Sequence, residues 1–177
     1  MELVIQDKTF EQYISAELIE QAVDRVAAKM NLELKDKCPL FIGLLNGAFM
    51  FAADLFKRLD FNCNISFVKL SSYEGTKSSG NISQHIGLTD KIKDRTIVII
   101  EDIVDTGTTL SYFINELKTL EPAEIKVASM FFKPDACKCE IKIDYLGMQI
   151  PNDFVVGYGL DYNGFGRNYG ELYKLKN

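Results

Sequence analysis

The feature that most constrains the fold is a short, continuously apolar run that ends in acids. Ile97–Ile100 contains only Ile and Val, and Glu101, Asp102 and a Thr/Gly-rich turn follow it in the stretch TIVIIEDIVDTGTTL (Thr96–Leu110). An unbroken apolar run of this length is typical of a strand buried on both faces of a parallel sheet. Polar groups at the carboxyl end of such a strand lie where open α/β sheets bind ligands. The stretch therefore predicts an α/β fold with a functional site at this sheet edge.

The remainder of the chain alternates apolar runs with helical stretches. Between Ser15 and Met30 the apolar residues recur with a helical period, which predicts an amphipathic helix capped by Ser15. Further helices are predicted over 49–59 and 109–120, and strands over 40–45, 65–70, 96–100 and 125–132. Because strands alternate with helices, we expect a central parallel sheet flanked by helices.

Length and composition favour a single domain over residues 1–177. The 177 residues, 47% of them hydrophobic, suffice for one full core. The stretch of about 71–87 is too rich in Ser, Gly and charge to pack, so it is predicted to be a flexible loop. The helical signal disappears after Lys133. We expect residues from about 1–12 and 134–177, including the β-like pieces 141–150 and 154–158, to build a small hood.

Charge and cysteine content exclude several classes of function. The formal net charge is -5 and no basic run is dense enough to follow a nucleic-acid backbone, so nucleic acid is not an expected partner. No apolar run has the length needed to span a membrane. Cys38, Cys63, Cys137 and Cys139 lack the spacing of a secreted disulfide framework, and the first residues lack signal-peptide features, which favours a cytoplasmic protein. The single histidine, His85, excludes a site with several histidine ligands.

The acids and the turn after the apolar run have a chemical interpretation of their own. Glu101 and Asp102 cannot both be buried and ionised without partners, because each would carry a desolvation cost of roughly several kcal/mol. Sugar hydroxyls or Mg²⁺ would satisfy them. The turn 105–109 leads into a helix, where free N–H groups, threonine hydroxyls and the helix dipole favour a phosphate. The alternative is that Thr108 or Thr109 merely caps the helix and that the acids are a solvated strand end.

These residues closely resemble the phosphoribosyl-pyrophosphate signature of the type I phosphoribosyltransferases. The resemblance rests on the stretch from Ile100 to Thr109, and it continues in blocks that match the hypoxanthine-guanine branch of the family. The blocks are LNGA (Leu45–Ala48), SSY (Ser71–Tyr73), VASMFFK (ending at Lys133), DFVVGYGLDY (Asp153–Tyr162) and FGR (ending at Arg167). The fold implied is that of this family, a central parallel sheet with a small hood.

By this resemblance the signature residues bind the phosphoribosyl group. Glu101 and Asp102 would face the ribose hydroxyls. The 5-phosphate would be held by the turn formed by Asp105, Thr106, Gly107, Thr108 and Thr109. The acid at the position of Asp105 lies near N7 of the purine in the family, which makes Asp105 the candidate general base. An acid there can also simply complement the helix dipole, and the two roles can coexist.

The resemblance assigns the base and the pyrophosphate to residues outside the signature. Lys133 would donate to the purine 6-oxo group, although a lysine at a strand end can also simply extend into solvent. Phe154 would stack on the purine and the backbone of Val155 would bind its edge, whereas the simpler alternative for Phe154 is a strand core residue. Asp161 would contribute to binding both the base and magnesium. The pyrophosphate would be bound by Asn46, Gly47, Arg167, Ser72 and Tyr73. Of these, Ser72 and Tyr73 belong to the loop that would act as a lid.

The expected cofactor is Mg²⁺. Phosphoribosyl pyrophosphate is strongly anionic, and the expected site is itself acidic, so without a cation it would repel its substrate. By resemblance the metal would lie among Glu101, Asp102 and Asp161, where it removes this repulsion and stabilises the leaving group. Many relatives carry a lysine at the position of Asn46, and they often hold the preceding peptide, here Leu45–Asn46, in the cis form.

Taken with the chemistry of the residues, the resemblance implies a magnesium-dependent enzyme of purine salvage. It would transfer the 5-phosphoribosyl group from phosphoribosyl pyrophosphate to N9 of hypoxanthine or guanine, with Asp105 as general acid and base, and release pyrophosphate. A homodimer or homotetramer is implied by the family alone. Two alternatives stay open: a regulator of the same fold that binds nucleotides without turnover, and a phosphoacceptor receiver domain, in which paired acids follow the first strand.

Overall fold

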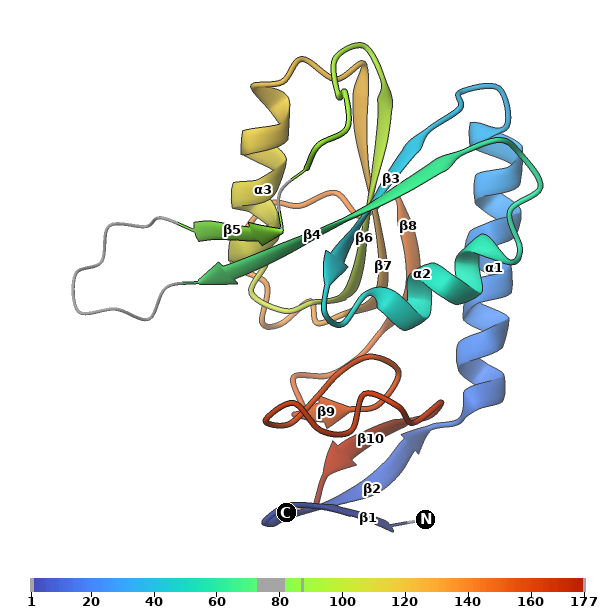
Figure 1. Cartoon of the computed structure of the whole chain (residues 1–177). Helices are drawn as coiled ribbons and strands as arrows, with labels where there is room; N and C mark the ends of the chain where they lie inside the picture. The colour runs from blue at the N-terminus through green and yellow to red at the C-terminus, as the bar shows by residue number, and fades with distance from the viewer. Residues whose placement is uncertain (1, 73–81, 87, 177) are drawn as a thin grey trace.

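The described residues form two sheets of different size. A computed structural model of the chain describes residues 2–72, 82–86 and 88–176, and Figure 1 shows its large upper sheet and its small lower one. The large sheet has the strand order β5-β4-β3-β6-β7-β8, and every neighbouring pair is parallel except β4 with β5. Its strands are β3 (Leu40–Leu45), β4 (Asn64–Ser72), β5 (Ile82–Ile86), β6 (Thr96–Val104), β7 (Glu124–Phe132) and β8 (Tyr145–Gln149). The predicted α/β fold with a central parallel sheet is confirmed.

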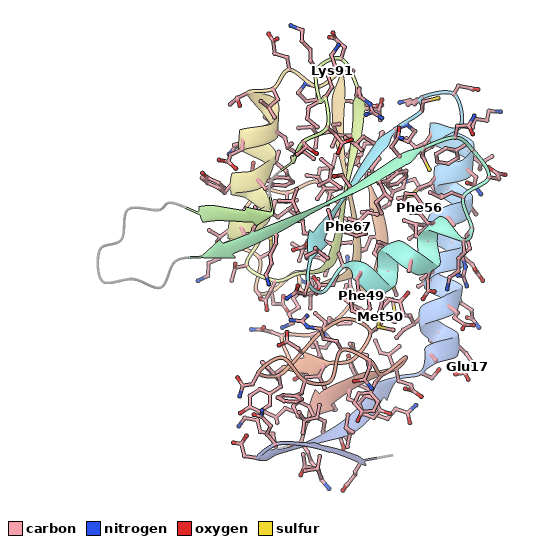
Figure 2. All side chains as sticks on the ribbon, viewed as in Figure 1. Glu17, Phe49, Met50, Phe56, Phe67 and Lys91 are labelled. Carbon is pink, nitrogen blue, oxygen red and sulfur yellow. The ribbon has the colours of Figure 1, made fainter. Side chains whose placement is uncertain are left out.

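In the described part of the chain, three helices cover the two faces of this sheet. They are α1 (Ala16–Leu34), α2 (Phe49–Phe56) and α3 (Thr108–Lys118). α1 and α2 pack on one face, where Phe56 and Phe67 border the core (Figure 2), and α3 packs on the other. The central strand β6 contributes alternately to both cores, with Val98 in the first and Ile97 in the second. This two-sided burial explains why the strand is apolar throughout.

The first helix begins where its cap predicts. The Ser15 side chain accepts a hydrogen bond from the backbone N–H of Leu18, so Ser15 is the N-cap, as predicted. The helix continues to Leu34, four residues beyond the predicted end, because its apolar stripe still contacts the sheet there. Leu18, expected on the buried stripe, is 48% exposed, since one helical step of about 100° separates it from Ile19 at the edge of the stripe.

The small sheet is the hood. Its strand order is β1-β2-β10-β9, all antiparallel, with β1 (Glu2–Ile5), β2 (Lys8–Ile14), β9 (Val155–Val156) and β10 (Leu172–Leu175). It joins the two ends of the chain around a core of Ile5, Phe10, Val156 and Tyr173. Figure 1 shows it below the large sheet, on the side where β3 ends and α2 begins. The hood predicted from the N- and C-terminal segments is thus present.

The boundaries of the predicted hood and loop need correction. Tyr145–Gln149 was expected in the hood, but it forms β8 and pairs with β7 in the large sheet, where the Tyr145 ring is buried. At the expected loop of 71–87, β4 continues to Ser72 and β5 pairs with it antiparallel from Ile82 to Ile86. Backbone pairing thus extends over polar residues that a composition-based prediction assigns to a loop. Residues 73–81 and 87 lie outside the described part.

Candidate active site

The candidate site lies where β6 extends beyond the end of its pairing with β3. Pairing between β3 and β6 ends at Gly43 and Ile100, whereas pairing between β6 and β7 continues to Val104 and Phe132. The strand, predicted to stop at Ile100, therefore runs on to Val104, and its last residues have one free edge. A cavity of about 270 Å³ lies there, lined by Leu44, Leu45, Asn46, Gly47, Leu70, Glu101, Asp102, Thr109 and Arg167.

Glu101 and Asp102 bring two neighbouring carboxyl groups into this cavity. Burial and the adjacent Asp102 raise the pKa of Glu101 well above its usual range. Burial raises the pKa of Asp102 to about 6, although hydrogen bonds and Arg167 act in the opposite direction. Asp102 Oδ1 accepts from the Ile103 N–H at 2.8 Å. Among the described residues, no lysine or arginine forms an ion pair with either acid. The pair is therefore poised to receive a cation or hydroxyl donors.

The chemistry of these acids fits Mg²⁺ only if other molecules complete its shell. Magnesium prefers oxygen ligands and is usually held by one or two carboxylates together with water and substrate phosphates. Within the described ranges, no group of three or more His, Cys, Asp or Glu side chains is arranged to hold a metal. Asp161, the third predicted ligand, instead pairs with Arg167 at 2.6 Å and accepts from the Gly164 N–H.

Gly47 is enclosed between the two halves of the site. A Cβ at this position would lie 1.4 Å from Asp102 Oδ2, so any side chain would displace the carboxylate. The Leu45–Asn46 peptide before it is cis. On its other side lies Gly159 of the hood, whose own Cβ would lie 2.1 Å from the Gly47 carbonyl oxygen. Backbone from β3, a carboxylate from β6 and backbone from the hood therefore meet around a single glycine.

The turn at 105–109 opens the helix α3 without a side-chain cap. Gly107 is the N-cap with φ 77°, and as a glycine it provides no side chain to cap the helix. Thr108 and Thr109 are the first residues of the helix, so neither caps it as the simpler alternative required. The Thr106 hydroxyl oxygen accepts a long hydrogen bond, 3.4 Å, from the backbone N–H of Thr108, the first residue of the helix. An open helix N-terminus with threonine hydroxyls suits a phosphate.

Lys133 and Asp105 form an ion pair beside this turn. Lys133 Nζ lies 2.9 Å from Asp105 Oδ2, and the lysine is 6% exposed at the end of β7. The side chain is therefore turned inward and does not extend into solvent. Its backbone is fixed as well, because the Lys133 N–H donates to the Val104 carbonyl. The candidate base and the candidate selector of the purine thus touch each other directly.

The hood provides an exposed aromatic ring, Phe154, and an arginine, Arg167, to the candidate site. Phe154 is 47% exposed, with Phe10 and Tyr162 packed against its ring, so it is not the strand core residue of the simpler alternative. Val155 is buried in β9 and pairs with Lys174. Arg167 donates to the Gly159 carbonyl at 2.6 Å and lines the cavity described above.

The predicted residues divide into groups. One cavity is lined by six of the predicted residues: Asn46, Gly47, Glu101, Asp102, Thr109 and Arg167. Asp105 and Lys133 form a separate ion pair with each other. Ser72 ends β4, and Tyr73 lies outside the described residues. Sequence reasoning assigned no role to Leu70 or Gly159, which border the cavity or its glycine. The Gly-Tyr-Gly sequence around Tyr158 was the signal available for Gly159, because repeated glycines mark unusual backbone.

Comparison with known families identifies the class of protein to which this chain belongs. Residues 10–163 match the family described as the phosphoribosyl transferase domain, so the chain belongs to the phosphoribosyltransferase family. The resemblance stated from the signature is confirmed, and with it the expectation of a transferase enzyme. The receiver-domain alternative is excluded by the same match.

Individual relatives point to one branch. The chain is 40% identical over 164 residues to the hypoxanthine-guanine phosphoribosyltransferase of Bacillus subtilis, covering 92% of this chain and 91% of the relative. It is 40% identical over 172 residues to that of Lactococcus lactis, covering 96% and 93%. A crystal structure of a hypoxanthine phosphoribosyltransferase from Staphylococcus aureus superposes with a TM-score of 0.89 at 33% identity, covering 99% of this chain and 98% of the other.

The described helices include none that is long and apolar enough to cross a membrane.

Proposed function

We propose that this chain transfers the 5-phosphoribosyl group from phosphoribosyl pyrophosphate to N9 of hypoxanthine and of guanine. The products are IMP or GMP and pyrophosphate. The observation that carries the proposal is the Lys133–Asp105 pair at 2.9 Å beside an open helix N-terminus. A 6-oxopurine has its carbonyl oxygen and N7 on one edge, so a donor and an acceptor this close can bind both. The names of the similar enzymes support the same substrates.

The phosphoribosyl group is held by the large sheet. The N–H groups and hydroxyls of Thr106, Gly107, Thr108 and Thr109 bind the 5-phosphate, with the positive end of the α3 dipole behind them. Glu101 and Asp102 accept hydrogen bonds from the ribose hydroxyls. These contacts satisfy two carboxyl groups for which the described residues provide no ion pair, and they fix the ribose with its C1 toward the hood.

The base is held between the sheet and the hood. Lys133 Nζ donates to the 6-oxo oxygen, which selects against adenine because its 6-amino group is itself a donor. Phe154 stacks on the ring, and the backbone of Val155 binds its edge. As N9 forms its bond to C1 of the ribose, the bond from C1 to the pyrophosphate oxygen breaks and N7 loses its proton. Asp105 accepts that proton.

The pyrophosphate leaves along the cavity that Gly47 borders. Asn46, Gly47 and Arg167 bind it, and Ser72 at the end of β4 and the following Tyr73 are further candidates to contact it. Glu101, Asp102 and Asp161 are the chain's candidates to bind Mg²⁺, which supplies charge neutralisation for the leaving group. Asp161 must release Arg167 to contribute, so the ion pair between them, at 2.6 Å, would open as the metal and pyrophosphate bind.

The wider setting follows from the same proposal. We expect the single domain of 177 residues to act in the cytoplasm as a homodimer or homotetramer. All four cysteines are unpaired, as expected of a reducing compartment. The oligomeric state can be measured by sedimentation, and the family is its main support.

A direct assay tests the proposal. The protein is incubated with phosphoribosyl pyrophosphate, Mg²⁺ and one base at a time, from hypoxanthine, guanine, xanthine, adenine and uracil, and pyrophosphate release is measured. We expect turnover with hypoxanthine and guanine, none with adenine or uracil, and loss of turnover when a chelator removes Mg²⁺. Binding of nucleotide without turnover of any base would instead favour the regulator of the same fold.

A further inference from the structure

The hood and the large sheet are joined by few polar contacts. Among the described residues, one side-chain hydrogen bond connects the hood strands and their loops with the large sheet and its helices, and it runs from the Tyr158 hydroxyl to Asp54 Oδ2 at 3.0 Å. The other side-chain bonds of the hood, such as Tyr162 to Asp7 and Arg167 to Gly159, stay within it. Asp54 lies on α2, the helix that begins two residues after Gly47.

Tyr158 is held in a conformation that a tyrosine does not adopt freely. Its φ is 46°, in the left-handed region, where bulky residues are rare and cost energy. The side chain is 3% exposed and packs edge-on against Phe131 of β7, with ring centroids 6.3 Å apart. Its backbone N–H donates to the Tyr169 carbonyl. Such a backbone persists only where the surroundings fix it, and the bond to Asp54 is one of the contacts that do so.

The backbone next to Tyr158 reaches the active site. Gly159 contacts the Gly47 carbonyl oxygen so closely that a Cβ would lie 2.1 Å from it. The same residue accepts from the Arg167 guanidinium through its carbonyl, and its N–H donates to the Arg167 carbonyl. A shift of the Tyr158 segment therefore moves Arg167, and it opens the contact with Gly47.

Asp54 is itself fixed in place. Its Oδ1 pairs with Lys57 at 2.9 Å, and Arg58 donates to its backbone carbonyl from the next helical turn. The Asp54 side chain is partly buried. Burial and the neighbouring carboxylate raise the pKa of Tyr158, so its hydroxyl remains protonated and donates at neutral pH.

We propose that Tyr158 and Asp54 are positioning residues that lock the hood onto α2 and so set the place of the purine subsite relative to the phosphoribosyl subsite. This rests on the proposed function, since it assigns a task to residues that touch neither substrate. The phosphoribosyl subsite lies on the large sheet, whereas Phe154 and Val155 of the purine subsite belong to the hood. A misplacement of about 1 Å between reacting groups can cost about 100-fold in rate. Loosening the lock should therefore slow the chemical step more than it weakens binding of the phosphoribosyl group to the large sheet.

The test compares two matched tyrosines. Tyr158→Phe removes one hydroxyl and keeps the ring, and Tyr145→Phe is the control, because Tyr145 is also buried and also donates to a carboxylate, Glu33 on α1, at 2.9 Å. We expect Tyr158→Phe to lower kcat about 10-fold, as for one lost hydrogen bond to a charged group. The Kd for ribose 5-phosphate, which lacks the pyrophosphate and needs only the phosphoribosyl residues of the large sheet, should change less than about twofold. Tyr145→Phe should keep the parent kcat.

Variants of Asp54, which accepts the Tyr158 hydrogen bond, distinguish a positioning role from a general loss of folding. Asp54→Ala should reproduce the loss in kcat, whereas Asp54→Asn, whose amide oxygen can still accept from the hydroxyl, should restore most of it. Hydrogen exchange on the whole chain provides a readout independent of turnover, and the Tyr158 and Gly159 amides should exchange faster in Tyr158→Phe than in Tyr145→Phe.

The outcomes are distinct. Parent values of kcat and of amide exchange in Tyr158→Phe would overturn the lock, as would equal losses of kcat in both tyrosine variants. Absence of turnover in the unaltered chain would overturn the proposed function instead, and the hydrogen exchange comparison would still decide whether Tyr158 fixes the hood.

Discussion

The two halves of the site are built in opposite ways. The phosphoribosyl half comes from one continuous segment, in which β6 delivers Glu101 and Asp102 and the following turn opens α3. The base and pyrophosphate half is assembled from separate segments, including the cis peptide after β3, the end of β7 and the loops around β9. A local segment can carry phosphate recognition by itself, because helix N-termini bind anions wherever they occur. Choosing a purine requires groups that only the packed fold brings together.

The first prediction tests Asp105, which belongs to the phosphoribosyl half and contacts Lys133 of the base half. Asp105→Asn keeps the shape and an oxygen acceptor but cannot take a proton, so kcat should fall about 100- to 10,000-fold. Nucleotide affinity, measured by calorimetry, should change far less. Asp135→Asn is a matched control, since Asp135 is an exposed acid two residues after Lys133. Equal losses of kcat and of affinity in Asp105→Asn would contradict the assignment of Asp105 as general base.

The second prediction concerns the packing between the halves. Gly47→Ala places a methyl group where Asp102 Oδ2 lies, so the carboxylate or the loop must move. We expect kcat/KM for phosphoribosyl pyrophosphate to fall about 100-fold, as for a misplacement near 1 Å. Gly170→Ala is the comparison, because the nearest atom to its added Cβ is the Ala16 Cβ at 3.9 Å. Steady-state kinetics of both variants would show whether the effect belongs to Gly47 alone.

The third prediction addresses the hood half alone. Phe154→Ala removes the exposed ring proposed to stack on the purine, and KM for hypoxanthine should rise about 10- to 100-fold. The affinity for phosphoribosyl pyrophosphate should stay near that of the parent, because Phe154 is proposed to contact only the purine. Phe165→Ala removes another exposed hood ring, 59% exposed, and should leave both constants unchanged. A rise in both constants in Phe154→Ala would mean that the halves are not separable.

The smallest expected effect is a change in stability caused by Asp102 in the phosphoribosyl half of the site. The pKa of Asp102, about 6 when folded against an ordinary value of 3.8, means that the folded state holds the proton more tightly than the unfolded chain. Asp102 therefore weakens the fold above about pH 6, and this penalty disappears as the pH falls from 6 towards 3.8. Asp102→Asn should stabilise the ligand-free protein by about 1 kcal/mol at pH 7.5, or about 2–4 °C, and by less at pH 4.5.

Thermal unfolding at the two pH values measures this difference. Asp135→Asn removes the same charge from an exposed position and should shift the midpoint at neither pH. A destabilised Asp102→Asn at pH 7.5 would show that the carboxylate is well solvated or paired, and the argument for a cation at this site would lose its support.

The prediction of the fold from sequence succeeded where the pattern is local. Local sequence determines three of the predicted features: the apolar run of β6, the Ser15 cap and the alternation of strands with helices. Each depends only on residues close in sequence. The errors arose where pairing partners decide. β6 runs to Val104 because β7 continues beside it, and Tyr145–Gln149 joins the large sheet because β7 offers an edge. Neither partner can be identified from the composition of the segment itself.

The sequence by itself determined the class of chemistry, since acids, threonines and a glycine at that spacing create an anion site at the start of a helix. The tertiary structure decided the rest. It paired Lys133 with Asp105, enclosed Gly47 between Asp102 and Gly159, and placed the Tyr158 hydroxyl on Asp54. These contacts join residues 28 to 112 positions apart in the chain. They form only when both cores are packed, because the energy that orders them comes from burial across the whole fold and not from the segments that carry the side chains.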